Sequence, residues 1–339
     1  MSANRPPRWD FASDNSAPAM PEVMEALARF NTGFAAAYGE DAICAHASDL
    51  IRGLLDADAP VWFAASGTAA NALSLACLAQ PHEAVAVHAQ AHVMTSEAGA
   101  PAFFGGGLGL IGLPGASRRI DPDALARRLE LPDDSHHQSP AVLSLTQATE
   151  AGTLYSEAQV GALIGLAKAH GLKTHLDGAR LANAAAGFDV RCLARGDLDL
   201  LVLGGTKAGS TPTEAIVLLN RDLERRFGAR LKHAGQMVSK ARYLAAPWIG
   251  MLETGAWIAR AAHANAMARR LAALTPFELQ HPVEANAVFA RVPPGLLERL
   301  EAAGWIAHPS GADDARFMCS WATTAEAVDE LGAVLKGVA

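Results

Sequence analysis

The chain has 339 residues, half of them apolar, and a formal net charge of −7 with acidic and basic residues mixed along its length. This length favours one large domain and a smaller one. No basic cluster with interleaved aromatic residues is present, which argues against a nucleic-acid partner. A membrane helix needs roughly 20 apolar residues, and the longest candidate, 243–262, is interrupted by Glu253 and Arg260.

The four cysteines lie far apart and form no CxxC pair, which is typical of reduced core residues: Cys44, Cys77, Cys192 and Cys319. The first residues, MSANRPPRWDFASD, contain no apolar core of a signal peptide. We therefore expect a soluble, cytoplasmic protein.

Short apolar runs alternate with helix-like segments along the first two thirds of the chain. The first predicted strand, 60–65, is followed by a helix at 68–79. Further strands are expected at 83–89, 108–114, 141–147, 173–177, 198–205 and 214–220, with helices at 121–131 and 156–171. Ser156 and Gly171 suit the start and the stop of the last helix. Uniformly apolar strands separated by helices predict a mostly parallel sheet covered on both faces.

Past residue 240 short apolar runs no longer alternate regularly with helix-like segments. A long helical stretch, 239–275, precedes a strand at 285–292, a helix at 294–305, a strand at 315–321 and a final helix. This order predicts a small α+β unit. The expected division is an α/β domain over 1–245 and a C-terminal domain over 246–339.

Ligands of a doubly wound sheet bind beyond the carboxyl ends of its strands, so the residues after each run are the candidates. Ser66, Gly67 and Thr68 follow the first strand. A glycine at a helix start could seat a phosphate, although these three residues alone favour an ordinary capped helix. Asp177 ends a later strand, two residues after His175 on the same face. It could hold a ligand's ring nitrogen protonated, or it could cap a helix beside a nearby arginine.

The chain has only six lysines, and Lys207 lies at a strand end within GGTKAGS. A desolvated lysine has a lowered pKa and can form a Schiff base. A phosphate seat, an acid for a ring nitrogen and a Schiff-base lysine are together what pyridoxal phosphate requires. The combination is far more specific than any of its members.

The sequence resembles fold-type I pyridoxal-phosphate enzymes, and within them the low-specificity L-threonine aldolases of the β-eliminating lyase group. The stretches that carry the resemblance are FASDNSAPAMPEVMEAL, AYGED, SGTAAN, HVMTSEAGAP, HLDGARLANA, GGTKAGS and ARFMCSWATT. The resemblance runs from about Phe11 to the last helix. It implies a large α/β domain of the pyridoxal-phosphate transferase type, with a small α+β domain at the C-terminus.

The resemblance also implies roles for single residues. Lys207 would form the Schiff base, Asp177 would pair with the pyridine nitrogen, and His92 would stack on the cofactor ring near the substrate hydroxyl. The remaining cofactor contacts would come from Ser66, Gly67, Thr68 and Arg180. Ser13, Arg180 and Arg316 would bind the substrate α-carboxylate, and Tyr38 would also contact the substrate. Tyr38 would reach the active site of a neighbouring subunit, because these enzymes are usually dimers of dimers. No metal is expected.

Two departures from the family pattern concern the site. Where many relatives have Asn-Thr-His after the fourth strand, this chain has Thr146-Gln147-Ala148-Thr149-Glu150, with no histidine. A water or Glu150 could take that histidine's place. The phosphate-binding arginine expected after the lysine loop has no clear match, and Lys240 is the candidate to replace it.

The activity implied is cleavage of L-threonine, L-allo-threonine and related β-hydroxy-α-amino acids to glycine and an aldehyde. The alternatives are another reaction of the same cofactor, such as β-elimination or transamination, and a non-catalytic member of the fold. A nicotinamide oxidoreductase is disfavoured. The GxGxxG match at 107–112 lies within or before a strand and is not followed by a helix.

Overall fold

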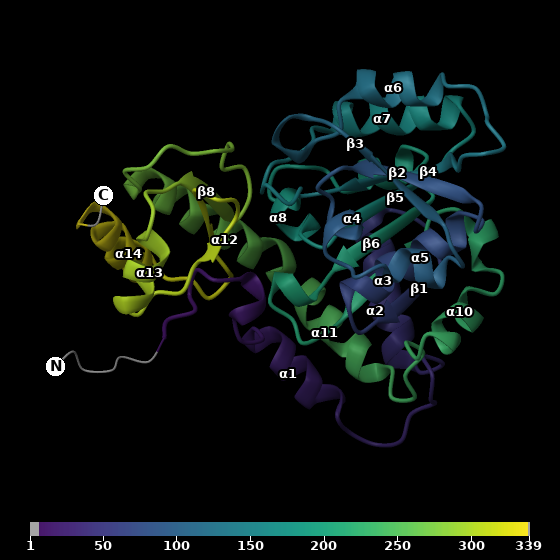
Figure 1. The fold of residues 1–339 in the computed structure, drawn as a ribbon. Coiled ribbons are helices and arrows are strands. Elements are labelled where there is room, and N and C mark those ends of the chain that lie inside the picture. Colours follow the sequence, from purple (N-terminus) through teal and green to yellow (C-terminus); the bar gives the residue numbers. More distant parts are fainter. Residues whose placement is uncertain (1–6, 338–339) are drawn as a thin grey trace.

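The computed structural model describes residues 7–337, which form a large α/β unit and a smaller unit joined by one long helix (Figure 1). The large sheet has seven strands in the order β1-β7-β6-β5-β4-β2-β3. Its strands are β1 (Val61–Ala64), β2 (Glu83–His88), β3 (Gly109–Leu113), β4 (Ser139–Thr146), β5 (Lys173–Gly178), β6 (Leu200–Gly204) and β7 (Glu214–Leu218). The order reverses between β2 and β4, because β3 pairs with one side of β2 and β4 pairs with the other.

Helices cover both faces of this sheet, as the apolar strands predict. One face packs against α3 and α10, and the other against α2, α6, α7 and α11. The helices of the large unit are α1 (Pro21–Phe30), α2 (Ala42–Leu55), α3 (Gly67–Leu78), α4 (His92–Thr95), α5 (Ala100–Phe104), α6 (Pro122–Leu129), α7 (Glu157–Ala169), α8 (Leu181–Ala185), α9 (Arg191–Arg195), α10 (Phe227–His233) and α11 (Arg242–Glu253). No helix within residues 7–337 is long and apolar enough to cross a bilayer.

The smaller unit packs a three-stranded antiparallel sheet against helices. The sheet has the order β8 (Ala287–Arg291), β10 (Asp314–Met318), β9 (His308–Pro309), and its helices are α12 (Ala256–Leu274), α13 (Leu296–Ala302) and α14 (Ala325–Gly337). The N-terminal segment joins this unit. Phe11 belongs to its apolar cluster, and the backbone N–H of Met318 donates to the carbonyl of Phe11 at 2.8 Å.

The prediction of a mostly parallel sheet is confirmed, with one qualification at its edge. Neighbouring strands pair in parallel throughout the part of the sheet ordered β6-β5-β4-β2-β3. In contrast, β7 runs antiparallel to both β6 and β1. Residues 205–213 alone connect β6 to β7, and a parallel crossover needs a longer connection that usually contains a helix. The chain therefore turns back on itself immediately after β6, and Lys207 lies in that turn.

Helix α7 begins and ends where the sequence predicts. The single long helix predicted after residue 240 is not found. Ser156 and Gln159 form a reciprocal capping box, and Gly171 has the left-handed φ of +75° expected of a stop. The predicted helix over 239–275 is two helices, α11 and α12, because Gly255 between them has a φ of +72°. The predicted domain boundary after residue 245 stays a prediction. It falls inside α11, and the change from the large apolar cluster to the small one occurs later, between Ala261 and Ala268 of α12.

The contact between α1 and α11 gives a test of this packing. A Cβ on Gly250 would lie 2.3 Å from the carbonyl oxygen of Glu22 and 2.9 Å from the Cβ of Ala26. Gly250→Ala should therefore separate the helices and lower the free energy of unfolding by about 1–3 kcal/mol, more than the helix propensity of alanine returns. The measurement is the thermal unfolding midpoint.

Gly161 of α7 is the matched control, because a Cβ there would meet no atom within 4 Å. Gly161→Ala should leave the midpoint unchanged or raise it. If both alanines have the same effect, the close approach of α1 and α11 is wrong.

Candidate functional site

Two fully buried tryptophans donate hydrogen bonds at the two ends of the lysine loop, residues 205–213. Trp257 donates its indole N–H to the carbonyl of Gly204 at 3.1 Å, and Trp248 donates to the hydroxyl of Thr213 at 3.1 Å. A Cβ on Gly204 would lie 2.3 Å from the carbonyl oxygen of Ala179, so only glycine allows β6 to approach the residues after β5 this closely. This packing places Lys207 beside the end of β5.

The amine of Lys207 lies among charges of both signs. Burial, then the charge of Arg180, lower the pKa of this amine, and the charges of Asp14, Asp177 and Glu214 oppose that shift. A lysine with a lowered pKa carries more of the neutral, nucleophilic amine at neutral pH. The structure therefore puts at the strand end the kind of lysine that forms Schiff bases.

Asp177, the candidate partner of a ring nitrogen, is buried, and both of its carboxylate oxygens accept hydrogen bonds. One oxygen accepts the backbone N–H of Ala179 at 2.9 Å, and the other accepts the side-chain amide of Asn71 at 2.9 Å. It makes no hydrogen bond to Arg180, and it does not cap α8, whose N-cap is Arg180, so the alternative of a capping aspartate with an arginine partner is not what the structure has. Asn71 comes from the inner side of α3 and was not singled out from the sequence.

His92 begins α4 and lies between Glu97, which is buried, and Glu150, which is half-buried. Its backbone N–H donates to Oε1 of Glu150 at 2.7 Å, and its ring Nδ1 is 2.9 Å from Oε1 of Glu97. The imidazole side chain keeps 39% of its exposure, whereas the side chain of Glu97 keeps 0%. Burial raises the pKa of Glu150, with the charge of Asp177 in the same direction and the hydrogen bond from His92 opposing it.

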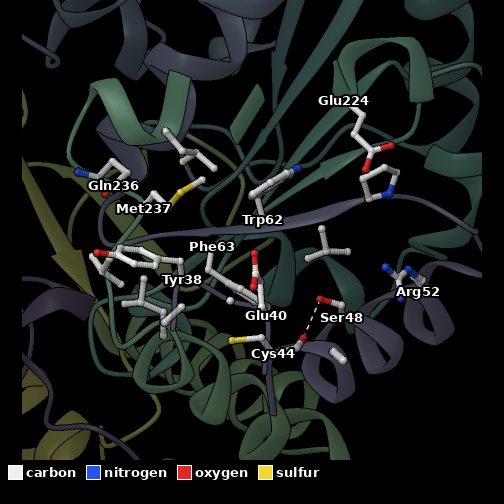
Figure 2. Close-up of a pocket in the computed structure, with 18 residues that line it drawn as sticks. Tyr38, Glu40, Cys44, Ser48, Arg52, Trp62, Phe63, Glu224, Gln236 and Met237 are labelled. Atoms are coloured by element: carbon white, nitrogen blue, oxygen red, sulfur yellow. Dashed lines mark hydrogen bonds between the residues drawn. The ribbon is translucent and has the colours of Figure 1, made fainter. Parts of the chain in front are cut away.

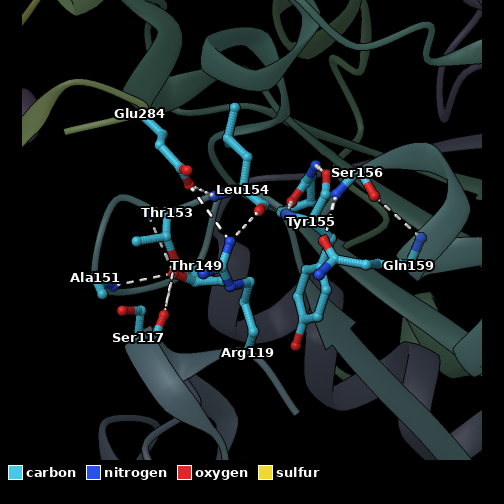
Figure 3. A network of polar contacts seen from close by, with 11 residues as sticks. Ser117, Arg119, Thr149, Ala151, Thr153, Leu154, Tyr155, Ser156, Gln159 and Glu284 are labelled. Carbon is cyan, nitrogen blue, oxygen red and sulfur yellow. Dashed lines mark hydrogen bonds and ion pairs between the residues drawn. The ribbon is translucent and has the colours of Figure 1, made fainter. Parts of the chain in front are cut away.

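A polar network fixes the loop that carries Glu150 (Figure 3). The hydroxyls of Thr149 and Thr153 are 2.8 Å apart, and that of Thr153 donates to the carbonyl of Ser117 at 2.7 Å. Arg119 donates to the carbonyl of Leu154 at 3.0 Å. The segment that has no histidine in this chain is thus a rigid turn, and its glutamate, not its threonine, contacts His92.

The three residues expected to bind a substrate carboxylate meet where the N-terminal segment passes between the two units. Arg180 forms a two-pronged ion pair with Asp14, at 2.7 and 3.0 Å. Arg316 of β10 donates to the carbonyl of Ala12 at 3.1 Å, and its buried Nε has no partner within residues 7–337. Ser13 caps the short 3-10 helix Asp14–Ser16 by accepting the N–H of Asn15 at 3.2 Å.

Asp14 neutralises one of these arginines. Burial alone would raise the pKa of Asp14, but the charge and hydrogen bonds of Arg180, with the charge of Lys207, hold it below its ordinary value. Arg180 is therefore already paired, and Arg316 is the cation with unused hydrogen-bonding capacity. Asp14 lies in the quoted FASDN stretch, so the signal for it was present in the sequence.

The phosphate seat has the geometry of a capped helix. The hydroxyl of Ser66 accepts the N–H of Ala69 at 3.3 Å, and α3 begins at Gly67, where a Cβ would meet no atom within 4 Å. The first N–H groups of a helix have no acceptor within the helix. Ser66 is thus the helix cap, while Gly67 and Thr68 remain the candidates to face an anion.

Tyr38 lies apart from the other predicted site residues. It lines a cavity of about 410 Å³ together with Cys44, Trp62 and Met237, and none of the other predicted site residues lines that cavity (Figure 2). Its role in a neighbouring subunit stays a prediction. Lys240 is exposed on the turn before α11. No group of three or more metal-binding side chains is present in the described part of the chain.

Glu214, the first residue of β7, is a buried carboxyl that the sequence analysis did not identify. It accepts the N–H of Gly205 at 2.9 Å, next to the lysine loop. Burial raises its pKa from 4.5 to about 7. Between these values the folded chain binds a proton that the unfolded chain lacks, so the free energy of unfolding falls as the pH rises through this window.

Glu214→Gln should remove this pH dependence while keeping the hydrogen bond to Gly205. Between pH 5 and pH 8 the free energy of unfolding of the wild-type protein should fall by on the order of 2 kcal/mol, whereas that of the variant should not fall. Urea unfolding at the two pH values measures the difference, and Glu25→Gln, at an exposed carboxyl, is the control. An unchanged pH slope in Glu214→Gln would assign the titration to another group.

Comparisons with known proteins agree with this geometry. The family model described as beta-eliminating lyase matches residues 10–293. The low-specificity L-threonine aldolase of Pseudomonas aeruginosa is 44% identical, with 95% of each chain covered, and that of Pseudomonas sp. (strain NCIMB 10558) is 41% identical, with 97% of each covered. The solved structure of Leishmania major threonine aldolase superposes with a TM-score of 0.91 at 28% identity, over 97% of this chain and 99% of that one. With its fold, its lysine loop and its full-length similarity all in agreement, this chain belongs to the beta-eliminating lyase family.

Proposed function

We propose that this protein is a pyridoxal-phosphate-dependent aldolase that cleaves L-threonine, L-allo-threonine and related β-hydroxy-α-amino acids to glycine and an aldehyde. The observation that carries the proposal is the convergence of Lys207, Asp177 and His92 at the strand ends, with the lowered pKa of the lysine amine. The names of the two Pseudomonas relatives support the same reaction.

The residues present fit this cofactor. Lys207 would bind its aldehyde carbon, Asp177 its ring nitrogen, and the start of α3 at Gly67 its phosphate, where there is space for a ligand. When bound, the cofactor supplies an electron sink for the bond that breaks at the substrate α-carbon. Asp177 keeps its place in this arrangement because Asn71 and the N–H of Ala179 hold both oxygens.

The protein's contribution is to orient the substrate and to move one proton. Arg316, whose Nε has no partner among the described residues, would bind the α-carboxylate. Ser13 would assist it, together with the part of the Arg180 guanidinium that does not bond to Asp14. A carboxylate held there fixes the rotation about the α-carbon, which decides the bond that is aligned for cleavage. His92 would accept the proton of the β-hydroxyl, since it is the partly exposed imidazole beside the site.

A second copy of the chain would complete the site. The resemblance favours a dimer of dimers in which Tyr38 enters a neighbouring active site. The 47% exposure of Tyr38 on the loop before α2 supports an interface role. The tetramer and the cytoplasmic location stay predictions.

The test is to incubate the purified protein with pyridoxal phosphate and L-threonine. Acetaldehyde and glycine should form in equal amounts, detected by a coupled alcohol dehydrogenase and by chromatography. Lys207→Ala should lower turnover by at least roughly 1,000-fold, and Lys336→Ala, at an exposed lysine, should not change it.

Release of a 2-oxo acid and ammonia in place of acetaldehyde would make the protein an eliminating lyase. Turnover that survives in Lys207→Ala would remove the lysine from the reaction.

A further inference from the structure

A continuous line of hydrogen bonds joins His92 to Asp177 across the site. The ring Nδ1 of His92 lies 2.9 Å from Oε1 of Glu97, which accepts the amide of Asn71 at 3.0 Å. The same amide nitrogen donates to Asp177 at 2.9 Å. The four residues come from α4, the turn after it, α3 and β5, so tertiary packing and not local sequence brings them together.

The middle of this line is sealed from water, and one end is open. Asn71, Glu97 and Asp177 are buried at 2%, 3% and 3% exposure, whereas the side chain of His92 keeps 39%. An ion pair or charged hydrogen bond with a buried partner is screened less by salt and solvent than one at the surface. The Glu97 carboxylate can therefore act strongly on the imidazole while the far edge of the ring remains reachable by a small molecule.

The donors along the line determine where the imidazole proton is. The amide nitrogen of Asn71 has two hydrogens, and the carboxylates of Glu97 and Asp177 accept them. An ionised Glu97 has no hydrogen to donate, so the hydrogen in its contact with His92 comes from Nδ1. The neutral ring is then protonated at Nδ1, and Nε2 has a free lone pair. Within residues 7–337 no group bonds to Nε2.

We propose that Glu97 is a positioning residue that fixes His92 in the Nδ1–H tautomer, with Nε2 as the proton acceptor, and that Asn71 ties this pair to Asp177. This inference rests on the proposed function for its kinetic consequence but not for its structural one. Glu150 supports it by fixing the backbone of His92 through the bond at 2.7 Å, so the ring can turn only about its own side-chain torsions. The carboxylate also stabilises the imidazolium that forms when Nε2 takes a proton from the β-hydroxyl.

The structural part can be tested without turnover. Full-length protein labelled with ¹⁵N-histidine, with and without pyridoxal phosphate, should show for His92 a protonated Nδ1 and a bare Nε2, assigned by comparison with His92→Asn. Glu97→Ala should shift the ring toward the Nε2–H form, whereas Glu97→Gln should keep the wild-type tautomer, because its amide oxygen still accepts. An Nε2–H ring in the wild-type protein, or an unchanged ring in Glu97→Ala, would overturn the proposal.

The kinetic part uses Glu97→Gln, which removes the charge and keeps the shape. Its kcat for L-threonine cleavage should fall about 10- to 100-fold, with KM changed less than about threefold. Exchange of the glycine α-proton with solvent, which involves no β-hydroxyl, should stay near the wild-type rate. Asp134→Asn is the control, because Asp134 pairs with His137 at the same 2.9 Å on the exposed surface.

A double-mutant cycle with His92→Asn then separates a positioning role from a general structural one. If Glu97 acts through His92, adding Glu97→Gln to His92→Asn should cost no further activity. Additive losses, or an equal loss in glycine exchange, would contradict the proposal. A wild-type protein that shows the expected tautomer but releases no acetaldehyde would remove the proposed function and leave the Glu97–His92 assignment standing.

Discussion

The buried ion pair between Asp14 and Arg180 is the contact on which the site depends. It ties the N-terminal segment to the end of β5 and places one negative charge among three cations, Arg180, Arg316 and Lys207. Burying a charge without a partner is costly, and a buried pair that loses one partner is strongly destabilised. With Asp14 in place, Arg180 is neutralised, and the segment that bears Ser13 and Ala12 is held against Arg316. Asn286 reinforces the contact with a bond to Asp14 at 3.2 Å.

This arrangement divides the work between two arginines that look equivalent in the sequence. The guanidinium of Arg180 is already paired with Asp14, so Arg180 acts mainly to hold the N-terminal segment beside the site. Arg316 comes from the small unit and has a buried Nε without a partner among the described residues. Arg316 is therefore the arginine with free hydrogen-bonding capacity for a substrate carboxylate.

The sequence was sufficient for features that rest on local rules. The capping box of α7, the glycine stop at Gly171 and a lysine immediately after β6 all follow from short-range pattern. It was not sufficient for the antiparallel β7, because the length of a connection restricts strand direction only once the neighbouring strand is known. Asn71 lies in a helix that is buried nearly all round, so no polar face marked it as functional. A role for Glu97 became evident only from its contact with His92.

The residues whose roles the sequence left open make different kinds of contact in the structure. Ser66 is a helix cap, which leaves Gly67 and Thr68 as candidates to face an anion. Asp177 has no bond to Arg180, and its partners are an amide and a backbone N–H. The ring of His92 contacts a fully buried carboxylate, that of Glu97. The bonds of Ser66 to Ala69 and of Asp177 to Ala179 are local. The bond between Asn71 and Asp177 joins residues 106 positions apart and could be identified only in three dimensions.

Of the six lysines, Lys207 is the one that we propose binds the cofactor. The most direct measurement is to add pyridoxal phosphate to the purified protein, reduce it with borohydride, digest it and locate the modified lysine by mass spectrometry. The account predicts one phosphopyridoxyl group per chain, on Lys207. Modification spread over the exposed lysines, or none at all, would contradict it.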